Sequence, residues 1–217
     1  MLRRRLTIVF VVLVLAAIWQ PALADGLAGR VQKAYESIES FQTDFAQKLT
    51  NAATQEVRDR SGVIQFKKPG LVRWETTAPE REILVVGPEI VWDYFPDEEV
   101  AYTYPAGQVF SSKTMLRFIS GQAMLEEDFN VTDQGVDDGL AKLRLVPKEP
   151  EPSLVLAYLW VEPESALLRR ILLVDFFGNG NELELRDMQV NAPLDSEVFT
   201  FTPPDGVDVL ENPELGG

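Results

Sequence analysis

Between Phe41 and Phe201 the chain is a succession of short segments in which apolar and polar side chains alternate, separated by turn signals. Residues 41–49 alternate in this way, and residues 182–190 do so again after the turn Gly178-Asn-Gly-Asn181. A period of two is typical of a strand with one buried face, and short connections favour antiparallel pairing. About ten or eleven strands are predicted, which is enough for a sheet to curl or close on itself.

Two segments interrupt the strands with helical spacing. Leu27, Val31 and Tyr35 place one apolar stripe on residues 26–39, and residues 111–127 fit one or two short helices split at Gly121. The expected fold class is therefore mainly β with a few helices (α+β). It is a single incomplete, strongly curved antiparallel β-barrel of about 10–11 strands, with the helices over its mouth.

The N-terminus has the pattern of an export signal. Residues 1–24 contain three arginines, an apolar run from Leu6 to Trp19 and an Ala-x-Ala site ending at Ala24. The apolar run is shorter than the roughly 20 residues that span a bilayer. We expect cleavage after Ala24, a periplasmic or extracellular protein, and one domain over residues 25–217. An uncleaved membrane anchor is the alternative.

Composition excludes several classes of function. The 217 residues include no Cys and no His, which removes disulfides, thiol chemistry, His- or Cys-based zinc sites and catalytic triads with a His base. The net charge of −14, which becomes −17 without residues 1–24, argues against nucleic acid as a partner. No cofactor and no metal site is expected.

Acidic pairs and triplets are the remaining candidates for chemistry. They occur at 97–99, 126–128 and 137–138, all at predicted turns or helix ends and without the spacing of a calcium loop. We interpret them as solvated acidic turns rather than as catalytic carboxylates, and we expect no enzyme.

Three stretches of the mature chain resemble one known family. They are Ser40-Phe-Gln-Thr-Asp-Phe-Ala-Gln-Lys48, Phe66-Lys-Lys-Pro-Gly-Leu-Val-Arg-Trp-Glu75 and Phe199-Thr-Phe-Thr-Pro-Pro-Asp-Gly-Val207. They look like the periplasmic outer-membrane lipoprotein carrier (LolA) family. The resemblance implies an incomplete barrel with a helical lid over a hydrophobic cavity. It also implies acylated lipoproteins as cargo, an inner-membrane ABC-type release complex as donor and an outer-membrane lipoprotein as acceptor.

The resemblance suggests roles for individual residues. The lid is expected to present Met115, Leu116, Phe118 and Ile119. Where the family has an Arg that bonds to the lid, this chain has Lys68, so Lys68 is the candidate latch; an exposed turn cation is the alternative. The predicted residues that line the acyl-chain cavity are Phe41, Phe45, Val72, Trp74, Trp92 and Leu156. An error of one residue in the strand register would move such a side chain to the opposite face of the sheet.

Three other functions stay open at the level of sequence. The same fold can carry another lipid, such as a phospholipid or glycolipid. A filled core would suit an envelope protein that binds partners, and a hydrolase can use carboxylates alone. We expect a monomer in either carrier case.

Overall fold

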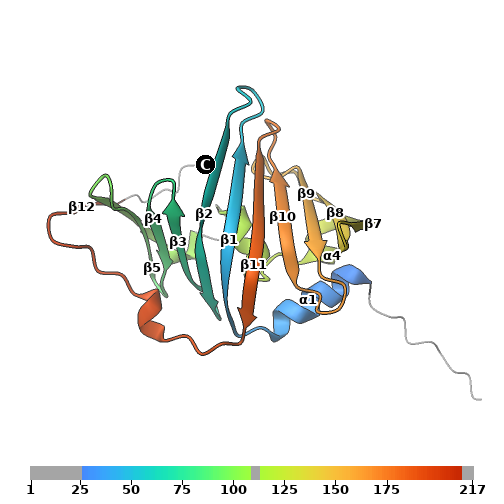
Figure 1. The fold of residues 1–217 in the computed structure, drawn as a ribbon, viewed down its shortest axis with the longest axis horizontal. Coiled ribbons are helices and arrows are strands. Elements are labelled where there is room, and N and C mark those ends of the chain that lie inside the picture. Colours follow the sequence, from blue (N-terminus) through green and yellow to red (C-terminus); the bar gives the residue numbers. More distant parts are fainter. Residues whose placement is uncertain (1–25, 109–112, 212–217) are drawn as a thin grey trace, which may run out of the picture.

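One twelve-stranded sheet organises the computed structural model, which describes residues 26–108 and 113–211 (Figure 1). The expected leader, residues 1–24, lies outside the described residues. In chain order the strands are β1 (Ser40–Thr50), β2 (Val57–Lys67), β3 (Leu71–Ala78), β4 (Glu82–Val86), β5 (Ile90–Phe95), β6 (Val100–Pro105), β7 (Phe129–Asp137), β8 (Leu140–Pro147), β9 (Leu156–Val161), β10 (Leu168–Val174), β11 (Gly180–Val190) and β12 (Asp208–Glu211).

The sheet is open. Its order is β12-β6-β5-β4-β3-β2-β1-β11-β10-β9-β8-β7, so β12 and β7 form the two edges. Neighbouring strands are antiparallel, except that β12 runs parallel to β6. This confirms the predicted incomplete, curved antiparallel barrel.

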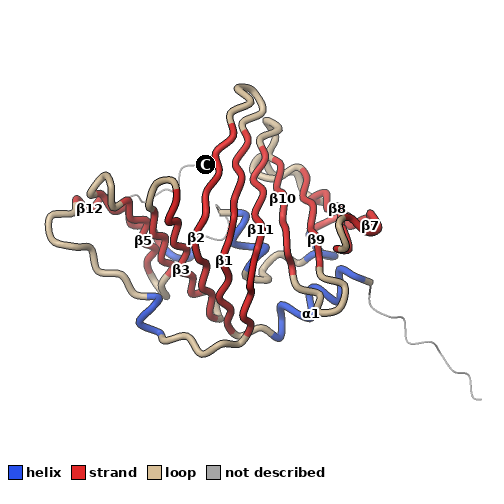
Figure 2. The backbone as a smooth tube through the Cα atoms, in the orientation of Figure 1, coloured by secondary structure: helices blue, strands red, loops and turns tan. Residues whose placement is uncertain are grey.

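The C-terminal part differs from the prediction. The succession of strand-like segments was expected to continue to Phe201. Its last part instead contains the 3-10 helix η2 (Ser196–Phe199), which begins where Asp195 accepts a hydrogen bond from the Glu197 amide (3.0 Å). The chain then continues around one end of the sheet to β12 (Figure 2). All four residues of β12 are exposed, so no alternating pattern marks this strand in the sequence.

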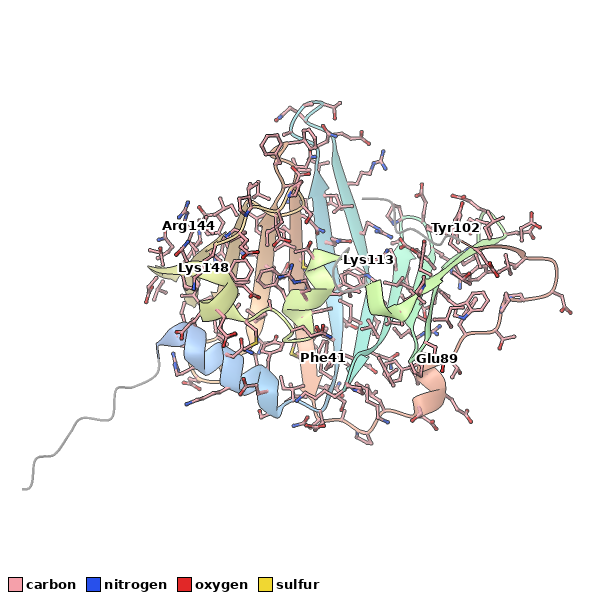
Figure 3. All side chains as sticks on the ribbon, turned by 180° about the vertical axis from the view of Figure 1, so that it is seen from behind. Phe41, Glu89, Tyr102, Lys113, Arg144 and Lys148 are labelled. Atoms are coloured by element: carbon pink, nitrogen blue, oxygen red, sulfur yellow. The ribbon has the colours of Figure 1, made fainter. Side chains whose placement is uncertain are left out.

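The helices lie on one face of the sheet, here called the inner face; the opposite face is the outer face (Figure 3). They are α1 (Leu27–Ser37), α3 (Thr114–Ile119) and α4 (Leu125–Asp128), with the 3-10 helix η1 (Ala106–Gln108) after β6. The predicted division near Gly121 is confirmed, since this residue has a positive φ of 73° between α3 and α4.

The main core lies between the inner face and the helices. Ala28, Val31 and Tyr35 of α1 are buried there together with α3 and with strands from both halves of the sheet. A smaller cluster covers the outer face near β4 and β5, where the Phe201 ring contacts Trp92 (5.5 Å) and Tyr94 (5.2 Å).

Gly62 allows a close approach of β2 and β3 at the centre of the sheet. A Cβ atom at this position would lie 1.9 Å from the Glu75 carbonyl oxygen and 3.0 Å from the Phe45 ring. Phe45 stands opposite Gly62 in the register, so its ring occupies the space that a side chain would need.

Replacement of Gly62 by Ala should therefore lower the free energy of unfolding by about 1–3 kcal/mol through overpacking. Urea unfolding followed by circular dichroism measures the change. Gly107→Ala is the matched control, because, apart from its chain neighbours, no atom of the described residues lies within 4 Å of the position that its Cβ would take. Equal stability of the two variants would contradict the assigned role of Gly62.

Candidate functional site

Aromatic and aliphatic side chains from neighbouring strands meet on the inner face. Phe41 and Phe45 of β1, Val72 and Trp74 of β3 all belong to or pack against the main core. The Phe45 and Trp74 rings are 5.0 Å apart, and Phe41 stacks on Phe66 at 5.3 Å. These predicted lining residues therefore share one face.

Two predicted lining residues lie on the other face. Trp92 is opposite Val85 in the register, whereas its neighbours Val91 and Asp93 face inwards. Leu156 alternates in the same way with Ala157, a fully buried member of the main core. The assignment of Trp92 and Leu156 to the cavity is corrected accordingly. Both stand in runs that are apolar on both faces, where alternation cannot reveal direction.

Helix α3 covers the inner face with its apolar side chains. Met115, Leu116, Phe118 and Ile119, the predicted lid residues, are all at least 94% buried in the main core. The Phe118 ring lies 5.6 Å from that of Phe129 at the start of β7. A six-residue helix is too short to be stable alone, so this burial is what holds it in place.

A cavity of about 650 Å³ remains beside the N-terminal end of α3. Leu84 and Trp74 from the sheet, Leu116 from α3 and Leu173 from β10 give it an apolar wall. Its volume lies within the range of about 300–1,000 Å³ that is usual for small-molecule sites.

Polar side chains also line the cavity. The Arg60 guanidinium forms an ion pair with Glu82 and donates a hydrogen bond to Thr76 Oγ1 (3.2 Å). Burial lowers the pKa of Arg60, opposed by the carboxylates of Asp93 and Glu80. Gln47 donates to Asn181 Oδ1 (2.9 Å), while its own carbonyl oxygen has no hydrogen-bond partner among the described residues. The cavity thus combines an apolar wall with polar groups, as a site for an amphipathic ligand would.

A partly buried ion pair ties α3 to the sheet. Lys113 Nζ, directly before α3, lies 3.3 Å from Asp93 Oδ2 on β5, and the Asp93 carboxylate is 6% exposed. The Tyr104 hydroxyl donates to the same oxygen at 3.4 Å. Burial, together with the charge of Asp93, raises the pKa of Tyr104 above its ordinary value.

A second ion pair holds α3 to the other half of the sheet. Arg117 lies 3.2 Å from Glu151, in the β8–β9 connection, and 3.8 Å from Asp128 of α4. Lys113 and Arg117 therefore fix one short helix to opposite halves of an open sheet.

Lys68, the predicted lid latch, bonds elsewhere. Its Nζ donates to the Glu36 carbonyl oxygen at 2.6 Å and lies 3.5 Å from Glu39. A cation here complements the C-terminal end of α1. The latch prediction is corrected: Lys68 fastens α1, and Lys113 and Arg117 make the polar contacts of α3.

Sequence reasoning missed Asp93, Lys113, Arg60 and Glu82. Asp93 carries the clearest available signal, because a lone charge inside the apolar run from Val91 to Phe95 has to find a partner. The partner of Asp93 is Lys113, which stands twenty residues later in the chain, beyond β6. The pairing itself therefore cannot be inferred from the spacing of the two residues.

The described part of the chain offers neither a metal site nor a membrane-spanning helix. Residues 26–108 and 113–211 hold no group of three or more Asp or Glu residues placed to bind a metal ion. Within the same ranges no helix has the length and apolar character needed to cross a bilayer.

Comparison with known proteins decides the family. The model of the family described as outer membrane lipoprotein carrier protein LolA matches residues 36–202. The chain belongs to this family. A LolA relative named outer-membrane lipoprotein carrier protein, from Methylococcus capsulatus, is 31% identical over 84% of this chain and 86% of its own. A protein of the same name from Nitrosomonas europaea is 31% identical over 80% of this chain and 83% of its own. The family resemblance inferred from the sequence is thus confirmed.

A solved structure shares the fold. An uncharacterized conserved protein from Thermus thermophilus superposes with a TM-score of 0.55, over 86% of this chain and 97% of its own, at 13% sequence identity. At this identity the likeness extends to the fold alone.

Replacement of Lys113 by Met should loosen α3, because it leaves the Asp93 carboxylate buried without its cation. We expect the free energy of unfolding to fall by roughly 1–3 kcal/mol. The decrease is smaller than for a fully buried pair, because the Lys113 side chain is 32% exposed. Hydrogen exchange of the α3 amides should rise, and adding Asp93→Asn should restore part of the protection.

The matched control is Arg186→Met, which breaks an exposed pair with Glu184 on β11 and should leave α3 unaffected. Unchanged exchange in α3 after Lys113→Met would contradict the assigned latch.

Proposed function

We propose that this protein is a periplasmic chaperone that carries lipoproteins by burying their acyl chains between α3 and the inner face of the sheet. The observation that carries the proposal is the arrangement of α3: its apolar side chains fill part of the inner face, beside a cavity of about 650 Å³. Membership of the LolA family supports lipoproteins as the cargo.

The energetics favour such a covered cavity. Each CH₂ group removed from water contributes about 0.8 kcal/mol, so an acyl chain cannot be released easily from a site that buries it fully. Here the empty protein already buries Met115, Leu116, Phe118 and Ile119. Cargo that enters must displace these contacts, and net affinity is the difference between two burials. A carrier that both binds and releases its cargo needs the difference between these two burial free energies to be small.

The predicted cavity residues have distinct parts in this proposal. Phe41, Phe45, Val72 and Trp74 supply the apolar surface on which acyl chains lie once α3 moves. Lys113 and Arg117 are the polar contacts that break when it moves. Arg60, Gln47 and Asn181 are within the cavity and suit the polar end of the cargo.

The names of the relatives support lipoproteins as cargo, and the pattern of residues 1–24 supports export. We infer that residues 1–24 direct export and are removed, and that residues 25–217 form a single carrier domain that acts as a monomer. The donor is an inner-membrane ABC-type release complex, and the acceptor is a lipoprotein of the outer membrane. The role is transport without catalysis, in keeping with a family of carriers.

Release of lipoproteins from spheroplasts tests the function directly. Purified protein beginning at Asp25, added to spheroplasts with a matched release complex, should bring acylated outer-membrane lipoproteins into the supernatant. Buffer and albumin are the controls. If the supernatant contains no lipoprotein although the release complex of the spheroplasts is active, lipoproteins are not the cargo. Analysis of lipid extracted from the protein would then test a phospholipid or glycolipid as the ligand.

Substitution of Phe118 tests the displacement of α3. Phe118→Ala removes burial worth about 3–5 kcal/mol from the empty state, so acylated lipoprotein should bind more tightly and pass to the acceptor more slowly. Phe118→Glu should instead reduce binding at least about tenfold, because a carboxylate then faces the acyl chains. Binding is measured by co-purification, with circular dichroism as the check on folding.

Leu210→Glu on the exposed strand β12 is the control for an added charge. Normal lipoprotein binding by folded Phe118→Glu would exclude α3 as the lid.

A further inference from the structure

Two neighbouring phenylalanines project into solvent from the turn between β10 and β11. Phe176 is 72% exposed and Phe177 77% exposed, and their rings contact each other edge to face with centroids 5.7 Å apart. In a chain that buries its other aromatic rings at least partly within the described residues, such exposure marks a surface for contact with an apolar partner.

The turn is held rigidly, so the exposure is built into the fold. Asp175 Oδ1 accepts hydrogen bonds from the amides of Phe177 (2.8 Å) and Asn179 (2.9 Å), and Oδ2 accepts one from the Asn179 side chain (2.8 Å). The Phe176 amide donates to the Pro152 carbonyl oxygen at 3.0 Å. The two rings are thus presented without the entropic cost of ordering a flexible loop.

The turn joins the tip of the β1–β2 hairpin to form one end of the molecule. Asn179 Oδ1 accepts a hydrogen bond from the Ala52 amide at 3.0 Å. Figure 1 shows the two tips side by side at the top of the sheet. We call this end, residues 51–57 and 175–179, the apex.

The apex has only two charged side chains, Glu56 and Asp175, although the chain as a whole is strongly acidic. Residues 51–55 and 176–181 contain no charged side chain. Both oxygens of Asp175 accept the hydrogen bonds just described, and Glu56 pairs with Arg58 at 2.7 Å. Val57, next to this pair, is 49% exposed.

The apex also borders the cavity. Asn51, Asp175 and Asn179 are among the residues that line it. A contact made by the two phenylalanines would therefore bring this part of the cavity wall close to the same surface.

We propose that the apex docks on the surface of a lipid bilayer, with Phe176 and Phe177 inserted at the boundary between headgroups and acyl chains. A bilayer is favoured over a protein because the apex offers two rings and almost no free charge for specific pairing. The acidic remainder of the chain limits the contact to this end, since it is repelled by anionic lipid. Contact through two rings is weak and reversible, as a shuttling protein requires.

Flotation with vesicles tests the proposal. The protein beginning at Asp25 is used, because the apolar run of residues 6–19 would itself bind lipid. With phosphatidylcholine–phosphatidylethanolamine vesicles, protein should float with the lipid, and the double variant Phe176→Ser, Phe177→Ser should bind at least roughly tenfold more weakly. Val136→Ser is the matched control, since Val136 is 73% exposed on β7, outside the apex.

Lipid charge supplies a second readout. Phosphatidylglycerol in the vesicles should weaken binding of the parent protein, and salt should restore it. The assay contains no lipoprotein, so its result is independent of the proposed cargo. The proposal would be overturned if the unsubstituted protein did not bind the vesicles, or if Val136→Ser weakened vesicle binding as much as the double variant. A protein would then be the partner of the two phenylalanines.

Discussion

Burial of the apolar face of α3 against the sheet is the interaction on which the rest of the structure depends. A single open sheet has no second sheet to cover its inner face, so short helices must exclude water from Phe41, Phe45 and their neighbours. Helix α3 has six residues and gains its stability from this contact rather than from its own hydrogen bonds. The same contact that completes the core is therefore also the one that cargo would replace in the proposed mechanism.

Polar contacts determine where this helix sits. Lys113 reaches Asp93 on β5, while Arg117 reaches Glu151 beyond β8, so the helix bridges strands that are far apart in the sheet order. Apolar contacts are tolerant of small shifts, whereas a buried ion pair requires one position and is costly to leave half satisfied. Together they give α3 one defined resting place and a discrete step on leaving it.

The fold followed from the sequence where one face of an element is apolar and the other polar. Strand β1 and helix α1 were recognisable on that basis, and the glycine itself marked the division at Gly121. Trp92 and Leu156 were assigned to the wrong face because their strands are apolar on both sides, with the Phe201 ring covering the outer face at Trp92. Strand β12 was missed because all of its side chains are exposed. Among the site residues, the Lys113–Asp93 pair depends on contacts between segments far apart in the chain, which no local pattern encodes.

The two edges of the open sheet differ in how they are finished. At one edge, the short strand β12 occupies the hydrogen-bonding groups of β6, and its Asp208 and Glu211 bring charge to the new edge. At the other edge, β7 is interrupted between Asp133 and Val136, where Asp133 accepts a hydrogen bond from the Gly135 amide at 2.7 Å. Irregular, charged edge strands are poor templates for another strand. A protein with an open sheet can thus be abundant in a crowded compartment without polymerising edge to edge.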